Sequence, residues 1–182
     1  LDFAKIDAQK LTLSKTPFEL RRLADSVVTM LQPLAKARSI ELVCRIDASL
    51  PSYFVGDDVR LRQVLINLLS NGIKFTHQGV VSLHIGDAAI STVLVDGTKL
   101  HAMTVRVSDS GIGMTPAVLA RLFQPFEQAD AGATRRSGGT GLGLCISQQI
   151  VYAMGGEIQV QSEPGRGSAF SFTIQMAAAA SS

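Results

Sequence analysis

The most informative part of this chain is a glycine-rich stretch, Gly138-Gly139-Thr140-Gly141-Leu142-Gly143-Leu144, which runs directly into a helical pattern of apolar residues. Glycine has no Cβ, so a backbone that is rich in glycine can pass close to a bulky ligand. A helix that begins there offers unpaired N–H groups and the positive end of its dipole to an anion. The stretch therefore predicts a phosphate site, although glycine runs also form ordinary turns.

A polar stripe marks the helix predicted upstream over Asp57–Phe75, where Asp57 is well placed as the N-cap. At 3.6 residues per turn, one narrow stripe holds Gln63, Asn67, Asn71 and Lys74, beside an apolar stripe of leucines and valine. Amide oxygens suit Mg²⁺ as ligands, and a lysine ammonium suits phosphate. A polar edge on a half-exposed helix explains the same residues equally well.

A single carboxylate, that of Asp109, follows the strand predicted over Met103–Val107. Strand alternation places Asp109 on the same face as Met103, Val105 and Val107, so it points inward at the end of an apolar face. A carboxylate in that position needs a hydrogen-bond donor, which the exocyclic amine of adenine would supply. The alternative is an aspartate that caps the following turn, which is common before Ser-Gly.

The region between these motifs and the glycine-rich stretch is predicted to be a long irregular loop over Gln124–Gly138. Two aromatic residues, Phe123 and Phe126, anchor its beginning, and Arg135 and Arg136 lie within it. A basic loop that leads into a phosphate site is typical of a lid. A plain surface loop is the alternative, and both descriptions can hold when no ligand is bound.

The order of the predicted elements indicates an α+β fold. Several predicted strands are joined by short turns, which require antiparallel pairing. We expect a two-layer α/β sandwich, in which a mixed, mostly antiparallel sheet is covered by about three helices on one face. The predicted helices are Glu19–Ala37, Asp57–Phe75, Met114–Phe123 and Leu142–Met154, and the predicted strands are Leu11–Phe18, Ile40–Ile46, Val80–Ile85, Met103–Val107, Glu157–Gln161 and Ala169–Ile174. The connection over residues 86–100, in which Asp96-Gly97 marks a turn, is longer than a tight hairpin needs.

Composition excludes several functions. The 182 residues are 46% hydrophobic with a net charge of +2, which is too weak to predict nucleic-acid binding. No apolar run of about 18 residues exists, so we expect no membrane contact by this chain. Two cysteines without metal-type spacing indicate reduced thiols in a cytoplasmic protein, with a disulfide as the minor alternative.

Taken together, the motifs resemble the catalytic ATP-binding domain of sensor histidine kinases, in the GHKL ATPase superfamily with its Bergerat-type fold. The resemblance covers about residues 16–176, and its details look most like hybrid kinases that carry receiver domains. The family's N box, first glycine box, F box and second glycine box resemble, in order, 67–76, 109–114, 122–126 and 139–144.

The resemblance implies specific roles for these residues. Asn71 would ligate Mg²⁺ at the ATP phosphates, Asn67 and Lys74 would assist there, and Asp109 would bind the adenine amine. The remaining nucleotide contacts would come from Phe75, Gly111, Gly113, Phe126, Arg135, Arg136, Gly139, Thr140, Gly141, Leu142 and Gly143. Catalysis would consist mostly of positioning and charge neutralisation.

The resemblance also implies a domain organisation. Residues 1–9 resemble the end of a dimerisation helix, 10–176 the catalytic domain, and 177–182 a disordered tail. No histidine lies in the family's phosphoacceptor context, so the acceptor would be on an upstream domain of a longer protein anchored in the bacterial inner membrane. The implied partners are that dimerisation domain and a receiver domain.

Two other functions are compatible with the sequence. One is a different GHKL ATPase, such as a chaperone or a type II topoisomerase, but the F box and residues 1–9 favour the sensor kinase. The other is a degenerate module that acts only by binding partners. The presence of all the polar residues expected to bind a nucleotide argues against it. Gly72 departs from the alanine usual in the family, at a cost to the helix of up to about 1 kcal/mol.

Overall fold

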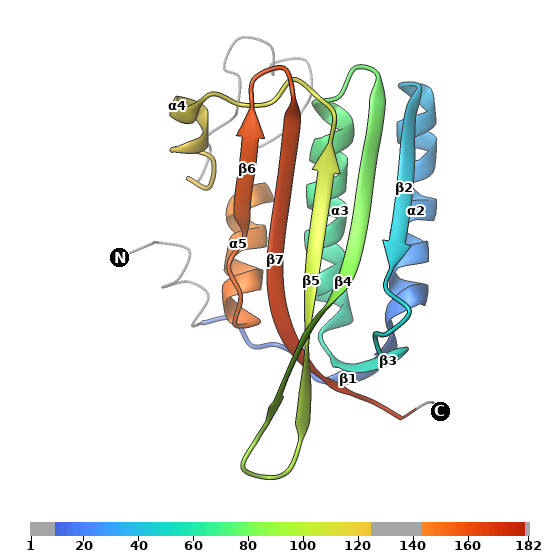
Figure 1. Ribbon diagram of the computed structural model, residues 1–182, viewed down its shortest axis with the longest axis vertical. Helices are drawn as coiled ribbons and strands as arrows, with labels where there is room; N and C mark the ends of the chain where they lie inside the picture. Colours follow the sequence, from blue (N-terminus) through green and yellow to red (C-terminus); the bar gives the residue numbers. More distant parts are fainter. Residues whose placement is uncertain (1–9, 125–142, 181–182) are drawn as a thin grey trace.

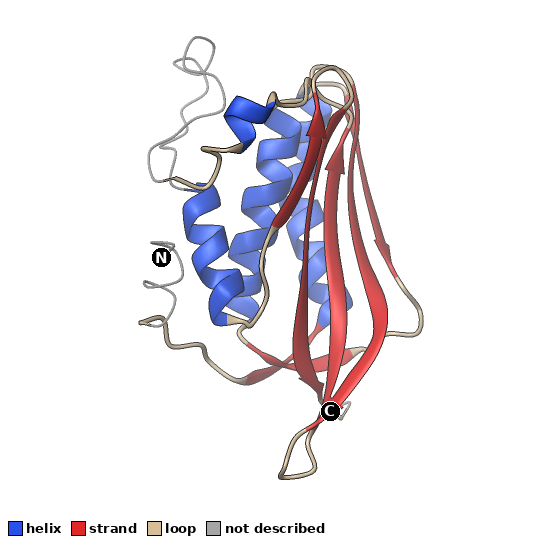
Figure 2. Cartoon of the chain, turned by 60° about the vertical axis from the view of Figure 1, so that its left-hand side comes forward, coloured by secondary structure: helices blue, strands red, loops and turns tan. Residues whose placement is uncertain are grey.

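A mixed seven-stranded sheet with helices on one face forms the domain (Figures 1 and 2). The structure is a computed structural model that describes residues 10–124 and 143–180. Among the described strands only β2 and β4 pair in parallel, in the order β1-β3-β7-β5-β4-β2 with β6 on β7. The predicted α+β class is confirmed. The strands are β1 (Thr16–Glu19), β2 (Ile40–Ile46), β3 (Tyr53–Gly56), β4 (Gly79–Val93), β5 (Lys99–Asp109), β6 (Gln159–Glu163) and β7 (Gly167–Ala178).

Three long helices cover one face of the sheet (Figure 2). They are α2 (Leu20–Ala37), α3 (Asp58–Lys74) and α5 (Gly143–Ala153), each close to its predicted bounds. The short helix α4 (Pro116–Leu119) is only part of the predicted Met114–Phe123, and Thr115 caps it by accepting a hydrogen bond from the Val118 N–H at 3.3 Å. Gly155, in the left-handed region at φ 85°, follows α5, a position where glycine commonly ends a helix.

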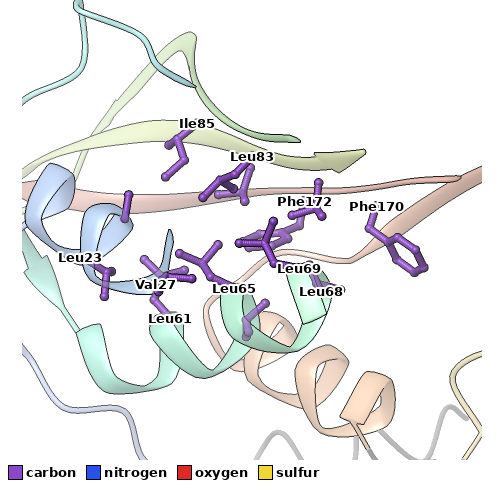
Figure 3. Close-up of a cluster of buried hydrophobic side chains, with 14 of the residues drawn as sticks. Leu23, Val27, Leu61, Leu65, Leu68, Leu69, Leu83, Ile85, Phe170 and Phe172 are labelled. Carbon is purple, nitrogen blue, oxygen red and sulfur yellow. The ribbon is translucent and has the colours of Figure 1, made fainter. Parts of the chain in front are cut away.

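The core lies between these helices and the sheet (Figure 3). Four leucines of α3 and two aliphatic residues of β4 are at most 1% exposed. They are Leu61, Leu65, Leu68 and Leu69 of α3, and Leu83 and Ile85 of β4. Burial of such side chains is the main favourable contribution to folding. Helical spacing places Met30 and Leu34 on the same apolar stripe of α2 as Leu31, but they are 59% and 45% exposed. They lie about 100° around the helix from the buried Leu31 and Ala35, on its flank.

The N-cap of α3 gives a testable contribution to stability. Asp57, 6% exposed, accepts hydrogen bonds from the N–H groups of Arg60 and Ser14, each at 3.0 Å. Burial alone would raise the pKa of Asp57, but these donors lower it more, so its pKa lies below the usual value. We expect Asp57→Ala to lower the free energy of unfolding by about 1–2 kcal/mol in urea titrations at pH 7.

The pH dependence of this effect has a defined sign. Because the folded-state pKa of Asp57 is depressed, its stabilisation is present above the unfolded pKa and is lost as the pH falls through the folded value. The difference between wild type and Asp57→Ala should therefore shrink below about pH 4. A difference that stays constant down to pH 2 would show that the carboxylate charge is not what stabilises the helix.

The predicted connection over residues 86–100 is wrong in one respect, because it is mostly strand. β4 and β5 continue past the sheet as a two-stranded arm, visible at the bottom of Figure 1, with a register shift between Asp87 and Ser91. The predicted Asp96-Gly97 turn closes it, and the Leu94 N–H donates to the carbonyl of Thr98. Four aliphatic side chains on the arm are exposed (Ile90, Val93, Leu94 and Val95). Without a buried face the arm has no periodic apolar pattern that a sequence could display.

The expected boundaries at the chain ends need a correction. Ala177 and Ala178, assigned to a disordered tail, belong to β7 and pair with Val55 and Phe54 of β3. Pairing with a neighbouring strand extends β7 because backbone hydrogen bonds do not depend on side-chain type. The predicted edge strand over Leu11–Phe18 is confirmed as β1, but it begins only at Thr16. Residues 1–9 lie outside the described part of the chain.

Across residues 10–124 and 143–180, no helix combines the length and the apolar composition needed to cross a membrane.

Candidate functional site

The predicted site residues within the described ranges belong to the C-terminal half of α3, to the end of β5 and the segment after it, and to the start of α5 (Figure 1). A Cβ added to Gly72 of α3 would lie 3.6 Å from the Cβ of Asp109 at the end of β5. The N–H of Ile112 donates to the carbonyl of Phe75, the C-cap of α3, at 3.2 Å. The N-box helix and the first glycine box are therefore direct neighbours, although they are more than 30 residues apart in the sequence.

Asp109 lies at the end of a fully buried face, as strand alternation predicts. Met103, Val105 and Val107 are at most 1% exposed, and the Asp109 side chain is half-buried after them. Burial raises the pKa of Asp109 above its usual value, and the backbone N–H groups of Gly111 and Ser168 oppose that shift. Its Oδ1 accepts from the Gly111 N–H at 2.9 Å, so the alternative role of turn cap is also realised. One carboxylate oxygen can serve the turn while the other accepts from a ligand.

The last turn of α3 presents an amide, an ammonium and an aromatic ring. Asn71 is half-buried, and its side chain makes no hydrogen bond to any residue in the described ranges. The ammonium of Lys74 lies 5.4 Å from the centre of the Phe75 ring. Thr76, the residue after Phe75, is fully buried, and its hydroxyl donates to the carbonyl of Gly72 at 2.7 Å. The amide of Asn71 is thus held on a firmly capped helix end and remains available to a ligand.

Asn67 has different surroundings from Asn71. Its side-chain nitrogen donates to the carbonyl of Gly143 and to the hydroxyl of Ser147, the latter at 2.8 Å. Both acceptors belong to α5, Gly143 at its first residue and Ser147 one turn later. Sequence reasoning missed Ser147, although its spacing of four residues from Gly143 would have placed the two on one helix face.

The glycines of the first box are required by close packing. A Cβ at Gly111 would overlap the carbonyl of Phe75, and one at Gly113 would overlap the carbonyl of Glu163 in β6. Gly167 (φ 87°), which was not among the predicted site residues, is similar, because a Cβ there would overlap the carbonyl of Asp109. These contacts bring the β6–β7 turn onto the end of β5, and the N–H of Gly165 donates to the carbonyl of Ile112 at 2.7 Å.

Two glycines with similar backbone angles separate strain from steric overlap. Gly113 (φ 69°) faces the Glu163 carbonyl, whereas a Cβ at Gly97 (φ 87°) in the arm would meet nothing within 4 Å. We expect Gly97→Ala to cost about 1 kcal/mol and Gly113→Ala about 2–4 kcal/mol in denaturant unfolding, because only the latter adds an overlap with backbone. Equal costs for the two variants would show that the packing at Gly113 is looser than described.

Several predicted site residues lie outside the described ranges, so their predicted roles stay predictions. They are Phe126, Arg135, Arg136, Gly139, Thr140, Gly141 and Leu142. Of the F box, Leu122 is 8% exposed and Phe123 packs against the core, as expected for the anchor of a loop.

Comparison with known proteins agrees with this arrangement. Residues 56–178 match the family described as histidine kinase-, DNA gyrase B-, and HSP90-like ATPase. The sensor protein GacS of Pseudomonas syringae pv. syringae is 44% identical over 177 residues, which are 97% of this chain and 19% of that protein. The chain thus spans about a fifth of the length of the curated relatives it matches.

Solved structures show the same fold. Full-length ShkA in complex with AMPPNP is 31% identical with a TM-score of 0.76, covering 98% of this chain and 35% of that one. The histidine kinase ThkA in complex with the response regulator protein TrrA is 25% identical with a TM-score of 0.66, covering 90% of this chain and 42% of that one. The chain therefore belongs to the histidine kinase-, DNA gyrase B- and HSP90-like ATPase family, as the ATP-binding catalytic domain of a sensor histidine kinase.

Proposed function

We propose that this domain binds Mg-ATP between α3, the end of β5 and the start of α5, and donates the γ-phosphoryl group to a histidine on a separate dimerisation domain. The observation that carries the proposal is the half-buried carboxylate of Asp109 beside the amide-bearing helix α3. A carboxylate that is part-desolvated and close to unpaired polar groups is typical of a binding site. The complex of ShkA with AMPPNP, an ATP analogue, supports the nucleotide class.

The described residues contact different parts of the nucleotide in this proposal. Asp109 accepts from the exocyclic amine of adenine, and Phe75 borders the ring. Lys74 faces the phosphates as a point charge. Gly111 and Gly113 let the backbone after β5 pack closely, which leaves room for a flat ring to approach. A Cβ at Gly111 would push this backbone away from Phe75 after α3, and one at Gly113 would push it away from β6.

The donor set at α3 fits Mg²⁺. Asn71 offers an amide oxygen without a partner among the described residues, and Mg²⁺ typically takes one or two protein ligands together with phosphates and waters. When bound, Mg²⁺ would neutralise charge on the phosphate oxygens. Asn71 would orient it from a capped helix end, and Lys74 would add positive charge at the same face.

In the proposed transfer, a nitrogen of the acceptor histidine forms a bond to the γ-phosphorus while the bond to the β,γ-bridging oxygen breaks and ADP leaves. The partners are the dimerisation domain that carries this histidine and the receiver domain of a response regulator or of the same hybrid chain. The complex of ThkA with the response regulator TrrA supports a receiver partner. Because ATP is the substrate, the proposal places the domain in the cytoplasm, within a protein anchored in the bacterial inner membrane.

Calorimetric titration with Mg-ATP tests the binding step. We expect the chain to bind with a stoichiometry of one, and to form no phosphohistidine by itself because the acceptor is on another domain. Addition of a purified dimerisation domain of a close relative should then give acid-labile phosphohistidine on that domain. A folded chain that binds no nucleotide would instead favour a degenerate module that acts through partners.

A further inference from the structure

The side chain of Asn67 joins helices α3 and α5. Its Nδ2 donates to the carbonyl oxygen of Gly143 and to Oγ of Ser147, which lie four residues apart on α5. An amide nitrogen has two protons, so both are engaged in these two bonds. The three residues are called the interhelical clamp below.

The orientation of the Asn67 amide is fixed by chemistry. The carbonyl of Gly143 can only accept hydrogen bonds, so the nitrogen rather than the oxygen of the amide must face it. With both protons engaged, Asn67 has none left to donate to a phosphate oxygen. A direct phosphate contact through Nδ2 would require the clamp to open.

Gly143 lets Asn67 approach α5 closely. A Cβ at this position would lie 2.8 Å from Nδ2 of Asn67 and nearer still to its Oδ1, and both contacts are closer than real Cβ atoms come. Any side chain at Gly143 would therefore displace the amide. The glycine is needed for this contact between the two helices.

Ser147 completes the clamp from inside the core. It is 0% exposed and sits within α5, and its hydroxyl lies against Asn67, 80 positions earlier in the sequence. A buried hydroxyl without a partner costs stability, and the hydrogen bond from Asn67 offsets that cost. The same bond fixes the rotamer of Asn67.

We propose that Ser147 is a positioning residue for the nucleotide site, acting through Asn67 to hold the first turn of α5 against α3. The inference rests on the proposed function, because Asn71 lies one turn after Asn67 and carries the proposed Mg²⁺ ligand. The clamp sets the spacing between that ligand and the helix start at Gly143. Asn67 then contributes to binding by holding α5 in place, with both protons of its side-chain nitrogen engaged by α5.

The test is a double-mutant cycle on nucleotide affinity. Wild type, Ser147→Ala, Asn67→Ala and the double variant are titrated with a non-hydrolysable ATP analogue and Mg²⁺, and each is melted without nucleotide. We expect Ser147→Ala to weaken binding by about 5- to 10-fold, the equivalent of one hydrogen bond. The double variant should bind no more weakly than Asn67→Ala alone, because Ser147 acts only through Asn67.

Two further variants keep the test specific. Ser147→Thr, which retains the hydroxyl, should recover most of the affinity even if the added methyl group lowers its melting temperature. Ser26→Ala is the matched control, because Ser26 lies in α2 and donates only to the carbonyl of Leu23 in its own helix. It should leave the affinity unchanged.

The outcomes separate this inference from the proposed function. If the folded wild type does not bind the analogue, the proposed function fails and the positioning role fails with it. If wild type binds and Ser147→Ala binds equally well while melting lower, Ser147 is purely structural. If Ser147→Ala weakens binding further in the Asn67→Ala background, Ser147 acts by another route. Either of the last two results overturns the inference alone.

Discussion

Replacing Asp109 with asparagine is expected to weaken Mg-ATP binding by about 10- to 100-fold, because a neutral amide replaces the charged acceptor proposed for the adenine amine. Calorimetry on wild type and Asp109→Asn measures the change directly. Equal affinities would remove Asp109 from the nucleotide site.

The same substitution is expected to stabilise the nucleotide-free domain at neutral pH. The folded-state pKa of Asp109 is raised by burial, so its favourable contribution is fully present below the unfolded pKa and is lost as the pH rises through the folded value. At pH 7 the ionised carboxylate is therefore a cost, which asparagine removes. Thermal unfolding should show Asp109→Asn melting above wild type at pH 7, with the advantage shrinking toward about pH 3.

A matched carboxylate in the arm provides the control for charge removal. Asp96 is exposed, and its pKa is lowered because the backbone N–H of Thr98 donates to it at 2.9 Å. Asp96→Asn should leave nucleotide binding unchanged and should not raise the melting temperature. An equal rise for both variants would mean that net charge, rather than burial at Asp109, determines the effect.

Truncating the core is expected to have the largest effect on stability. Leu69 is 0% exposed in α3, within the cluster drawn in Figure 3. We expect Leu69→Ala to lower the free energy of unfolding by about 2–5 kcal/mol, from lost transfer free energy and the cavity left behind. Urea denaturation followed by circular dichroism measures the change.

Val59 provides a control on the same helix. It is 68% exposed, so Val59→Ala should change stability by less than about 0.5 kcal/mol. A small loss for Leu69→Ala would show that neighbouring side chains collapse into the space. A large loss for Val59→Ala would show that its side chain is covered in solution.

The parts of the fold that could be predicted are those with local signals. β2 over Ile40–Ile46 and the N-cap at Asp57 match their sequence patterns, because burial on one face imposes a period and a cap requires a specific side chain. The inward position of Asp109 followed from strand alternation alone. The neighbouring positions of α3 and the first glycine box followed only from the family resemblance.

The parts that could not be predicted depend on tertiary neighbours. β3 over Tyr53–Gly56 has only four residues, and it is a strand because β1 and β7 pair with it. The exposure of Met30 depends on whether another element packs against that side of α2. The helical spacing of apolar residues does not determine this. The contact of Asn67 with Ser147 spans 80 positions, so only the packing of α3 on α5 brings it about.

The sheet order has a consequence for synthesis on the ribosome. β7 follows every other described strand in the chain, yet it alone joins the β1–β3 pair to the β5–β4–β2 group, and it also pairs with β6. Pairings between distant segments form late because the chain must close long loops first. A nascent chain released before Gly167 would hold two separate pieces of sheet with their edges open. The domain is therefore expected to fold after translation of its last strand rather than progressively from its N-terminus.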